Sequence, residues 1–524
     1  MNQKSKLIWL IPLSLGILFD ILFWKQIPGI NFFIFAVLCL LGGFLVLHRL
    51  EVKPSIRSWF LVVPILFFAA VTFVRQEPLT VFLGGFFTLF LLAELAFTYK
   101  GGQWVSFGIF DHLTSFLGLG GGMIARPFVY LSSNSSNNEN INRSNKKGWA
   151  VFRGVLLAIP VLLIFTYLLS SADLVFAQKV ESFTNLFRLE KLPEYIFRLA
   201  YILIGAYLLM GVFLHAAASK QNENSKEEKK PLVPAFVGFI ETTIILSSVV
   251  ILFTLFVIVQ FKYFFGGAAN IHLDGFTYAE YARKGFGELI AVAAISLLLV
   301  IGFSGLSKRE KPVHQTVFSG LGIAIVLLVG VMLISAYQRL VLYETAYGFS
   351  ELRTYTHVFI IWLAVLLLAV MILELFRKER YFALAAILAA IGFAATLPIM
   401  NVDGFIVMKN INRAAHGQEL DVSYLASLGY DAIPALANQF ANPKMSTDLH
   451  EQVGAALVCM QDSFPSSDRL NWRSYHYSRS KAMQVYNQLE NDLANYVLEK
   501  ETYNKLVATP SGQKIDCFNS RGSD

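Results

Sequence analysis

The stretch YQRLVLYETAYGFSELRTYTH, residues 337–357, lies between two apolar runs, Val317–Ala336 and Val358–Phe376. Each run is long enough to cross a bilayer, because a membrane-spanning helix needs about 20 mostly apolar residues. A simple turn between two such helices needs only a few polar residues. This one instead carries charges of both signs and four tyrosines at the expected membrane boundary. The pattern predicts two spans joined by a polar connection that is equipped for chemistry or for binding.

Composition indicates the same class for the whole chain. Of its 524 residues, 55% are hydrophobic and only 15% are charged, whereas a soluble domain has about 25% charged residues. The net charge of +7 does not indicate nucleic-acid binding, because the Lys and Arg residues lie mainly in short loops between apolar runs. We therefore expect an all-α, polytopic transmembrane helical bundle in a cell membrane.

We expect eleven spans, and the first is a retained span rather than a signal peptide, because no small-residue cleavage site follows it. Loops on the N-terminal side of the bilayer carry about twice as many Lys and Arg as the others, which places the N-terminus in the cytoplasm and the C-terminal segment outside. The expected spans are Leu7–Trp24, Gly29–Leu47, Trp59–Val74, Leu79–Tyr99, Val155–Ser171, Ala200–Ala216, Phe236–Phe261, Leu289–Gly305, Val317–Ala336, Val358–Phe376 and Tyr381–Met400.

Another apolar stretch, Ser106–Met123, is expected not to cross the bilayer. It contains Asp111 and His112 and ends in a glycine-rich run. Counting it as a span would place every later basic cluster on the outer side, against the positive-inside rule. We interpret it as an interfacial or re-entrant helix on the cytoplasmic face.

Four regions follow from this order. Residues 1–130 form an N-terminal membrane region with four spans and the interfacial helix, and residues 131–148 form a polar cytoplasmic linker. Residues 149–400 form a membrane core with seven spans. Residues 401–524 lack a spanning run, and their apolar residues recur at helical spacing, which predicts a small helical extracytoplasmic domain with one long helix over Asn471–Lys500.

Two of the three cysteines, Cys459 and Cys517, fall in this C-terminal domain. A disulfide between them is compatible with an oxidising outer face. Two free thiols are equally compatible with the sequence, because Cys517 lies close to the chain terminus.

The outer loops of this topology bring charged and aromatic residues to one membrane boundary. Charges there are costly unless they are paired or hydrated. We expect pairs such as Glu280 with Arg283, and Glu344 or Glu351 with Arg339 or Arg353. Such pairs could simply staple the ends of the spans together, but the arginines and tyrosines favour a pocket that grips an anion. The candidate ligand-binding residues are Asp173, Glu280, Arg283, Arg339, Tyr343, Glu344, Tyr347, Glu351 and Arg353.

The notable ionisable groups within the spans are the carboxylates of Asp20, Glu94 and Glu241. An isolated membrane carboxylate suggests proton relay or cation binding. Asp20 and Glu94 lie near span ends and could reach the interface. Glu241 is followed by several Ser and Thr residues that could form a polar track, although such hydroxyls usually bond their own helix backbone.

Enzyme and cofactor signatures are missing from the sequence. It contains no HExxH, GxSxG or P-loop motif and no Cys or His spacing of the metal-binding type. We therefore expect no metal site and no cofactor, and we assign no catalytic residue.

Several segments, in consistent order between about residues 150 and 490, match signatures of one family. They are Ser170–Asp173, Gln260–Gly267, Phe276–Glu288, Leu342–Arg353, Phe359–Trp362, Glu419–Leu425 and Asn471–Arg473. In these segments the chain resembles the bacterial membrane-protein family named domain of unknown function 4173. The resemblance implies a bacterial multi-pass membrane protein and implies no particular activity.

The sequence thus leads to three hypotheses. In the first, the charged, tyrosine-rich outer site binds a small or lipid-borne anionic ligand, in the manner of a transporter. In the second, the protein is a membrane sensor or assembly component whose outer loops and C-terminal domain bind an envelope protein partner. In the third, it is a membrane-embedded enzyme that acts on an envelope lipid or glycan precursor. Beyond the lipid bilayer, the expected partners are these ligands or proteins and not nucleic acid.

Overall fold

The structure is a computed structural model of the chain. It describes residues 3–136, 192–218, 236–264, 286–308, 311–462, 471–500 and 505–517, together with scattered residues between 158 and 180. The expected fifth span, Val155–Ser171, falls largely outside these residues.

Long apolar helices dominate the described residues. Nine are long and apolar enough to cross a membrane, and α1 (Gln3–Phe23) adds a shorter apolar segment, Ile8–Phe23. The chain is thus a multi-pass, all-α protein in its membrane part. The bounds are α2 (Ile30–Arg49), α3 (Ile56–Trp59), α4 (Val62–Val74), α5 (Pro78–Thr98), α9 (Leu192–Ala218), α10 (Phe239–Phe264), α13 (Phe286–Leu306), α14 (Pro312–Tyr347), α15 (Glu351–Leu375) and α16 (Phe382–Met400), with short 3-10 turns η1 (Gln103–Ser106) and η4 (Glu379–Tyr381).

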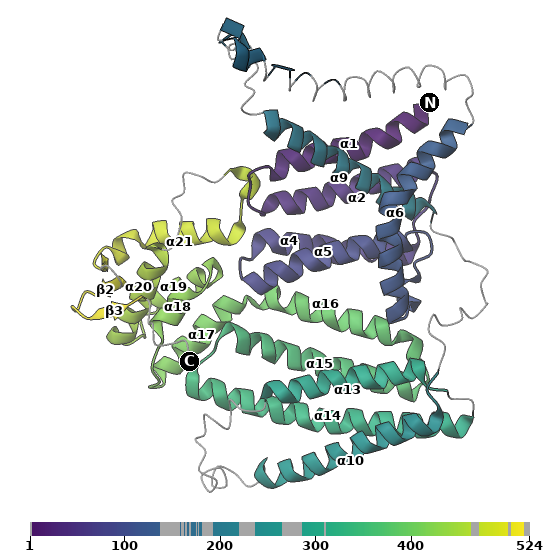
Figure 1. Ribbon diagram of the computed structural model, residues 1–524. Coiled ribbons are helices and arrows are strands. Elements are labelled where there is room, and N and C mark those ends of the chain that lie inside the picture. Colours follow the sequence, from purple (N-terminus) through teal and green to yellow (C-terminus); the bar gives the residue numbers. More distant parts are fainter. Residues whose placement is uncertain are drawn as a thin grey trace.

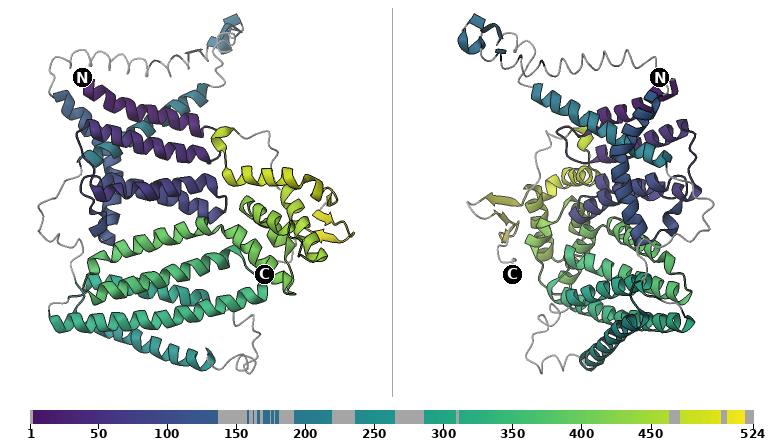
Figure 2. Two further views of the ribbon diagram at one scale, coloured as in Figure 1. Left: turned by 180° about the vertical axis from the view of Figure 1, so that it is seen from behind. Right: turned by 45° about the vertical axis from the view of Figure 1, so that its right-hand side comes forward.

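These helices lie side by side, and α6 (Ile109–Ser136) runs across their ends instead of alongside them (Figure 1). The N-terminus lies at the α6 end, and the C-terminal helices gather at the opposite end, as Figure 2 shows from two further directions. Helix α6 packs against α9 and α5. A Cβ atom at Gly211 of α9 would lie 2.2 Å from the Met123 carbonyl oxygen of α6, so the absence of a side chain there allows the two backbones to touch.

The chain leaves the bundle through a bend at Asn401, which has a left-handed backbone conformation (φ 55°). The C-terminal region then packs against the spans through one continuous apolar core, in which Val358 of α15 and Leu397 of α16 join residues of the region itself. Its helical elements are α17 (Val402–Ala415), α18 (Val422–Ser427), η5 (Tyr430–Ala432), α19 (Ile433–Phe440), α20 (Thr447–Asp462), η7 (Trp472–Ser474) and α21 (Tyr477–Leu493).

The prediction of a single helix over Asn471–Lys500 is wrong in the extent of the helix. Helix α21 ends at Leu493, and a small antiparallel sheet of order β1-β2-β3 follows. The strand β1 is favoured because β2 supplies hydrogen-bond partners for its backbone, a contact between distant residues that helical periodicity does not reveal. The strands are β1 (Val497–Lys500), β2 (Lys505–Ala508) and β3 (Lys514–Asp516).

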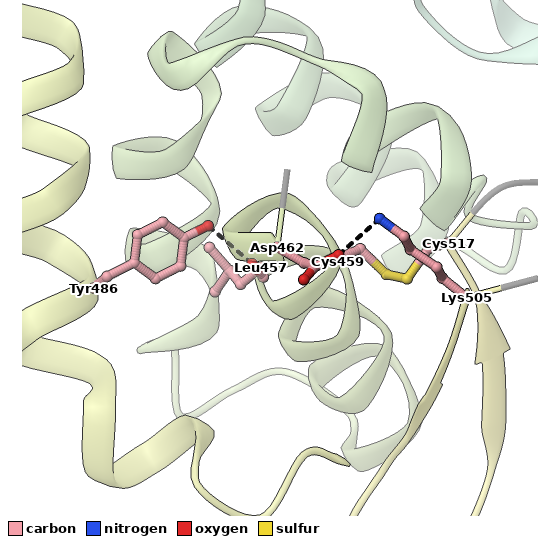
Figure 3. The surroundings of a disulfide bond; sticks show 6 residues. All are labelled: Leu457, Cys459, Asp462, Tyr486, Lys505 and Cys517. Atoms are coloured by element: carbon pink, nitrogen blue, oxygen red, sulfur yellow. Dashed lines mark hydrogen bonds and ion pairs between the residues drawn. A yellow bond between two sulfur atoms is a disulfide. The ribbon is translucent and has the colours of Figure 1, made fainter. Parts of the chain in front are cut away.

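A disulfide between Cys459 of α20 and Cys517, next to β3, fastens this sheet to the helices (Figure 3). The two Cα atoms are 5.5 Å apart. Beside the bridge, Asp462 accepts a hydrogen bond of 2.7 Å from Lys505, and Tyr486 donates one of 2.8 Å to the Leu457 carbonyl. The third cysteine, Cys39, is free and lies in α2.

Replacing Cys459 with Ser should destabilise the C-terminal region. The bridge joins residues 58 positions apart, and closing a loop of that length contributes about 4 kcal/mol through the unfolded state. We expect limited proteolysis of purified protein to cleave this region much faster in Cys459→Ser than in the parent. The matched control, Cys39→Ser, should behave as the parent, and equal cleavage of all three proteins would contradict the role of the bridge.

Candidate functional site

The connection between α14 and α15 is much shorter than the sequence predicted. Helix α14 continues to Tyr347, α15 begins at Glu351, and the turn consists of Gly348, Phe349 and Ser350. Gly348 has a φ of 81°, a conformation that favours glycine at a helix end. Most of the stretch 337–357 is therefore helical, and its side chains face one another across a tight hairpin.

Within the hairpin, Glu344 has a different partner from the arginines that we expected. Its Oε2 atom lies 3.3 Å from His357 Nε2, and the Tyr337 ring stacks on His357 at 4.8 Å between centroids. Glu344 is 2% exposed. These contacts hold α14 and α15 together near the turn that joins them.

Arg353 and the two tyrosines form a second group in the hairpin. The Arg353 guanidinium lies 4.1 Å from the centroid of the Tyr343 ring, and Tyr343 packs edge-on against Tyr347 at 5.0 Å. Arg353 also donates to the carbonyl oxygen of Gly348. Its donors thus bind the protein's own turn.

Side chains of helix α17 form hydrogen bonds with the backbone at the turn of this hairpin. The Asn410 amide accepts a hydrogen bond of 2.7 Å from the Phe349 N–H and donates one of 2.9 Å to the Phe349 carbonyl. Arg413 reaches the carbonyls of Thr345 and Ala346 at the end of α14. The backbone polar groups that a tight turn leaves unpaired are thereby satisfied by the C-terminal region.

A group of four carboxylates, three of them buried and Glu351 half-buried, lies beside these α17 contacts, and only Glu351 was among the candidates from the sequence. Asp403 is 0% exposed, Glu77 3% and Asp431 4%. They come from four separate segments: the start of α5, the start of α15, the start of α17 and η5. One local signal was available, because Glu77 precedes Pro78 and caps α5 by accepting hydrogen bonds of 2.7 and 2.8 Å from the Leu79 and Thr80 N–H groups.

Each carboxylate of this acidic group has its own partners. Asp431 accepts hydrogen bonds from Ser478 (2.8 Å) and from the Gln76 N–H (2.6 Å) and forms an ion pair with Arg75 (3.3 Å). Glu77 also accepts a hydrogen bond from the Tyr355 hydroxyl.

Asp403 interacts electrostatically with Glu351, and one of its oxygens accepts the Gly429 N–H at 3.1 Å. Two carboxyl groups that interact in this way hold one proton between them, since two ionised groups would repel each other. Burial, followed by the charges of Glu351, Asp431 and Glu77, raises the pKa of Asp403 to about 8. The junction between spans and C-terminal region therefore holds a titratable proton.

Of the three carboxylates expected within the spans, Asp20 and Glu94 have side-chain partners and Glu241 lies at a helix end. Arg198 of α9 donates two hydrogen bonds to Asp20, of 2.9 and 2.5 Å. His112 Nδ1 of α6 lies 2.5 Å from Glu94 Oε1 of α5, and both side chains are buried. Glu241 is exposed in the first turn of α10. Thr242, Thr243 and Ser248 were expected to form a polar track. Their hydroxyls instead donate hydrogen bonds to backbone carbonyls one turn earlier in the same segment.

The remaining candidates are Asp173, Glu280, Arg283 and Arg339. Asp173 is exposed and accepts the Phe176 N–H at 2.7 Å. Glu280 and Arg283 fall among residues 265–285, outside the described residues. Arg339 lies on α14 within the hairpin. Among the described residues no cluster of three or more His, Cys, Asp or Glu side chains is placed to hold a metal ion.

A groove of about 570 Å³ opens on the C-terminal region between α17, α19 and the start of α20. Two lysines, three side-chain amides and a hydroxyl supply its polar lining. These residues are Lys409, Lys444, Asn412, Gln439, Asn442 and Ser446. In the part of the chain that the structure describes, no Asp or Glu lines the groove and neither lysine forms an ion pair. Sequence analysis missed it because its residues come from three separate elements.

These features define a class: an integral membrane protein with many apolar helices, a helical region docked at one end of the bundle, and a carboxylate-rich junction between them. Residues 62–439 match the family described as Domain of unknown function (DUF4153), and the chain belongs to this family. The resemblance found in the sequence was to a differently numbered family of unknown function, 4173. It also began later in the chain, at about residue 150 instead of residue 62. No curated protein and no solved structure matches the chain.

Replacing Asp403 with Asn should reduce the dependence of stability on pH. A folded-state pKa of about 8, against an ordinary value of 3.8, means that the folded protein keeps this proton at pH values where the unfolded chain loses it. Stability should therefore fall as pH rises from about 4 to about 8. The asparagine keeps an acceptor for Gly429 without the charge. We expect the melting temperature of Asp403→Asn to fall less than that of the parent between pH 6 and pH 9.

The exposed Asp448 offers the matched control. Asp448→Asn should retain the pH dependence of the parent. If Asp403→Asn retained it as well, the shared proton at the junction would be ruled out.

Proposed function

We propose that the C-terminal region faces the outside of the cell and that its groove binds the anionic head group of a lipid-borne ligand. The proposal for sidedness rests on the excess of Lys and Arg in the N-terminal-side loops. Because the N-terminus and the C-terminal region lie at opposite ends of the bundle (Figure 1), a cytoplasmic N-terminus implies an extracytoplasmic groove.

The observation that carries the proposal is the chemistry of the groove. Lys409 and Lys444 place two ammonium groups on its lining beside amides, with no carboxylate among the described lining residues. An anion would gain charge-assisted hydrogen bonds from the ammonium groups, which are roughly twice as strong as neutral ones. The amides can bond either phosphate oxygens or sugar hydroxyls. A phosphate or a phosphorylated sugar fits this lining best.

The position of the groove favours a ligand that is attached to a lipid. Helix α17 follows directly after α16, whose Ile399 is 71% exposed and belongs to the membrane-spanning part. The Lys409 ammonium lies 5.5 Å from the ring centroid of Phe405 and 5.9 Å from that of Phe349 in the hairpin turn. Met408, also on the lining, is 50% exposed. Apolar surface thus adjoins the polar groove, as a head group with attached chains requires.

The hairpin residues that the sequence proposed as the ligand site have a supporting role in this account. Their contacts with Asn410 and Arg413 fix α17, and α17 presents Lys409 to the groove. Asp403 on the same helix contacts Glu351 of α15. A ligand that shifts α17 would therefore act on the spans through the shared proton, which suits a transporter or a receptor.

The double variant Lys409→Gln/Lys444→Gln tests the proposal. Loss of two hydrogen bonds from charged groups, each about 1.5–3 kcal/mol, should weaken binding of dihexanoylphosphatidylglycerol at least tenfold. Calorimetric titration of the detergent-solubilised protein measures this, and a parallel titration with glycerol 1-phosphate separates head-group binding from chain binding.

The exposed Lys481 provides a control in which a lysine outside the groove loses its charge. Lys481→Gln should bind as the parent does. Equal affinity of the double variant and the parent would refute the groove as the binding site. Equal affinity for the lipid and for glycerol 1-phosphate would refute the lipid-borne ligand and leave a small anion.

A further inference from the structure

A second cavity lies among the spans, between α2, α5, α6 and α9, and has a volume of about 310 Å³. Its lining is almost entirely hydrocarbon, with Leu40 and Phe44 from α2, Leu92 and Ala96 from α5 and Phe213 from α9. It shares no residue with the groove on the C-terminal region.

The cavity is long and narrow. Along α2 its lining runs from Phe32 to Leu47, which at 1.5 Å per residue is about 22 Å. Helices α5 and α9 contribute only their halves nearer α6, and α6 itself adds Leu119 and Met123. Leu89 on the wall is 62% exposed, so the cavity opens sideways between the spans. At that depth the surroundings are lipid chains, because the helices that form the walls are membrane-spanning.

Three cations lie where the cavity ends near α6. Arg49 follows the lining residue Leu47 by two positions, Lys100 follows the lining residue Tyr99 directly, and Arg126 follows Met123 by about one helical turn. Arg49 and Arg126 are exposed. Among the described residues none of the three forms an ion pair with a carboxylate. A negatively charged group at this end would meet three positive charges.

We propose that this cavity binds an acyl chain of an anionic phospholipid from the leaflet nearest α6, with the phosphate held between Arg49, Lys100 and Arg126. The chain fills the apolar slot along α2, and the head group remains at the interface where α6 lies. Positive charge at this rim favours an anionic lipid over a zwitterionic one of the same chain length, since the interaction between opposite charges is added to equal apolar burial.

Helix α6 completes the wall of the site. Its backbone contact with Gly211 and the Glu94–His112 pair hold it across the ends of α5 and α9. Because α6 supplies both lining residues and Arg126, the bound lipid bridges the interfacial helix and the spans.

The chain contains its own probe for this site. Cys39 lines the cavity and is the thiol left over when Cys459 and Cys517 pair. A bimane label on Cys39, in protein reconstituted into nanodiscs, will report lipids whose acyl chains carry a nitroxide quencher. We expect phosphatidylglycerol with a labelled chain to quench at about one third of the mole fraction that labelled phosphatidylcholine requires, since a preference of that size needs only about 0.7 kcal/mol.

A control label sits on the same helix. Leu41 is 55% exposed and lies at nearly the same depth, so bimane on Leu41→Cys in a Cys39→Ser background should be quenched equally by both lipids. In Arg49→Gln/Lys100→Gln/Arg126→Gln, the Cys39 label should lose its preference for the anionic lipid. Lys409→Gln/Lys444→Gln should keep it, which separates this site from the outer groove.

An unlabelled measurement guards against disturbance by the dye. Short-chain phosphatidylglycerol should slow alkylation of Cys39 by N-ethylmaleimide in the parent but not in the triple variant. Equal quenching of the Cys39 label by both lipids, or a preference that survives in the triple variant, would overturn the proposal.

Discussion

The side-chain amide of Asn410 bonds both backbone polar groups of Phe349, and the docking of the C-terminal region on the bundle depends on this contact. A three-residue turn between two spans leaves its N–H and C=O groups without helical partners at the edge of the bilayer, where such groups are costly. Helix α17 supplies the partners. It is thereby fixed against α15, and Asp403 on its first turn is placed beside Glu351. The position of the polar groove follows from the same docking, because α17 forms one of its walls.

The two ends of the bundle present contrasting chemistry. At one end α6 lies across the spans and contributes to the wall of an apolar cavity, and we propose that Arg49, Lys100 and Arg126 lie at its rim. At the other end the C-terminal region covers buried carboxylates and exposes a groove lined by ammonium and amide groups. Both arrangements suit amphiphilic ligands, one through the chain and the other through the head group. We propose that the protein contacts lipids of both leaflets.

Sequence periodicity and hydropathy located the span helices, because the bilayer imposes length and apolar composition on each segment independently. The same reasoning set Ser106–Met123 apart from the spans, and α6 lies across them. Local patterns could not show that α14 continues to Tyr347, since charged residues at 339 and 344 suggested a loop, whereas His357 and Tyr337 bury Glu344 within the hairpin. The acidic group also could not be predicted from the sequence, because Glu77, Asp403 and Asp431 are far apart in the chain. Likewise β1 depends on its pairing with β2, which sequence spacing alone does not reveal.

Labelling of intact cells with a membrane-impermeant maleimide tests the central claim, the sidedness of the two ends, most directly. Two exposed lysines provide labelling positions at the two ends of the bundle. They are Lys481 in α21 of the C-terminal region and Lys53 between α2 and α3 at the α6 end. In a Cys39→Ser background, Lys481→Cys should react in intact cells, and Lys53→Cys should react only after the membrane is permeabilised. The reverse pattern would place the groove in the cytoplasm and contradict the account.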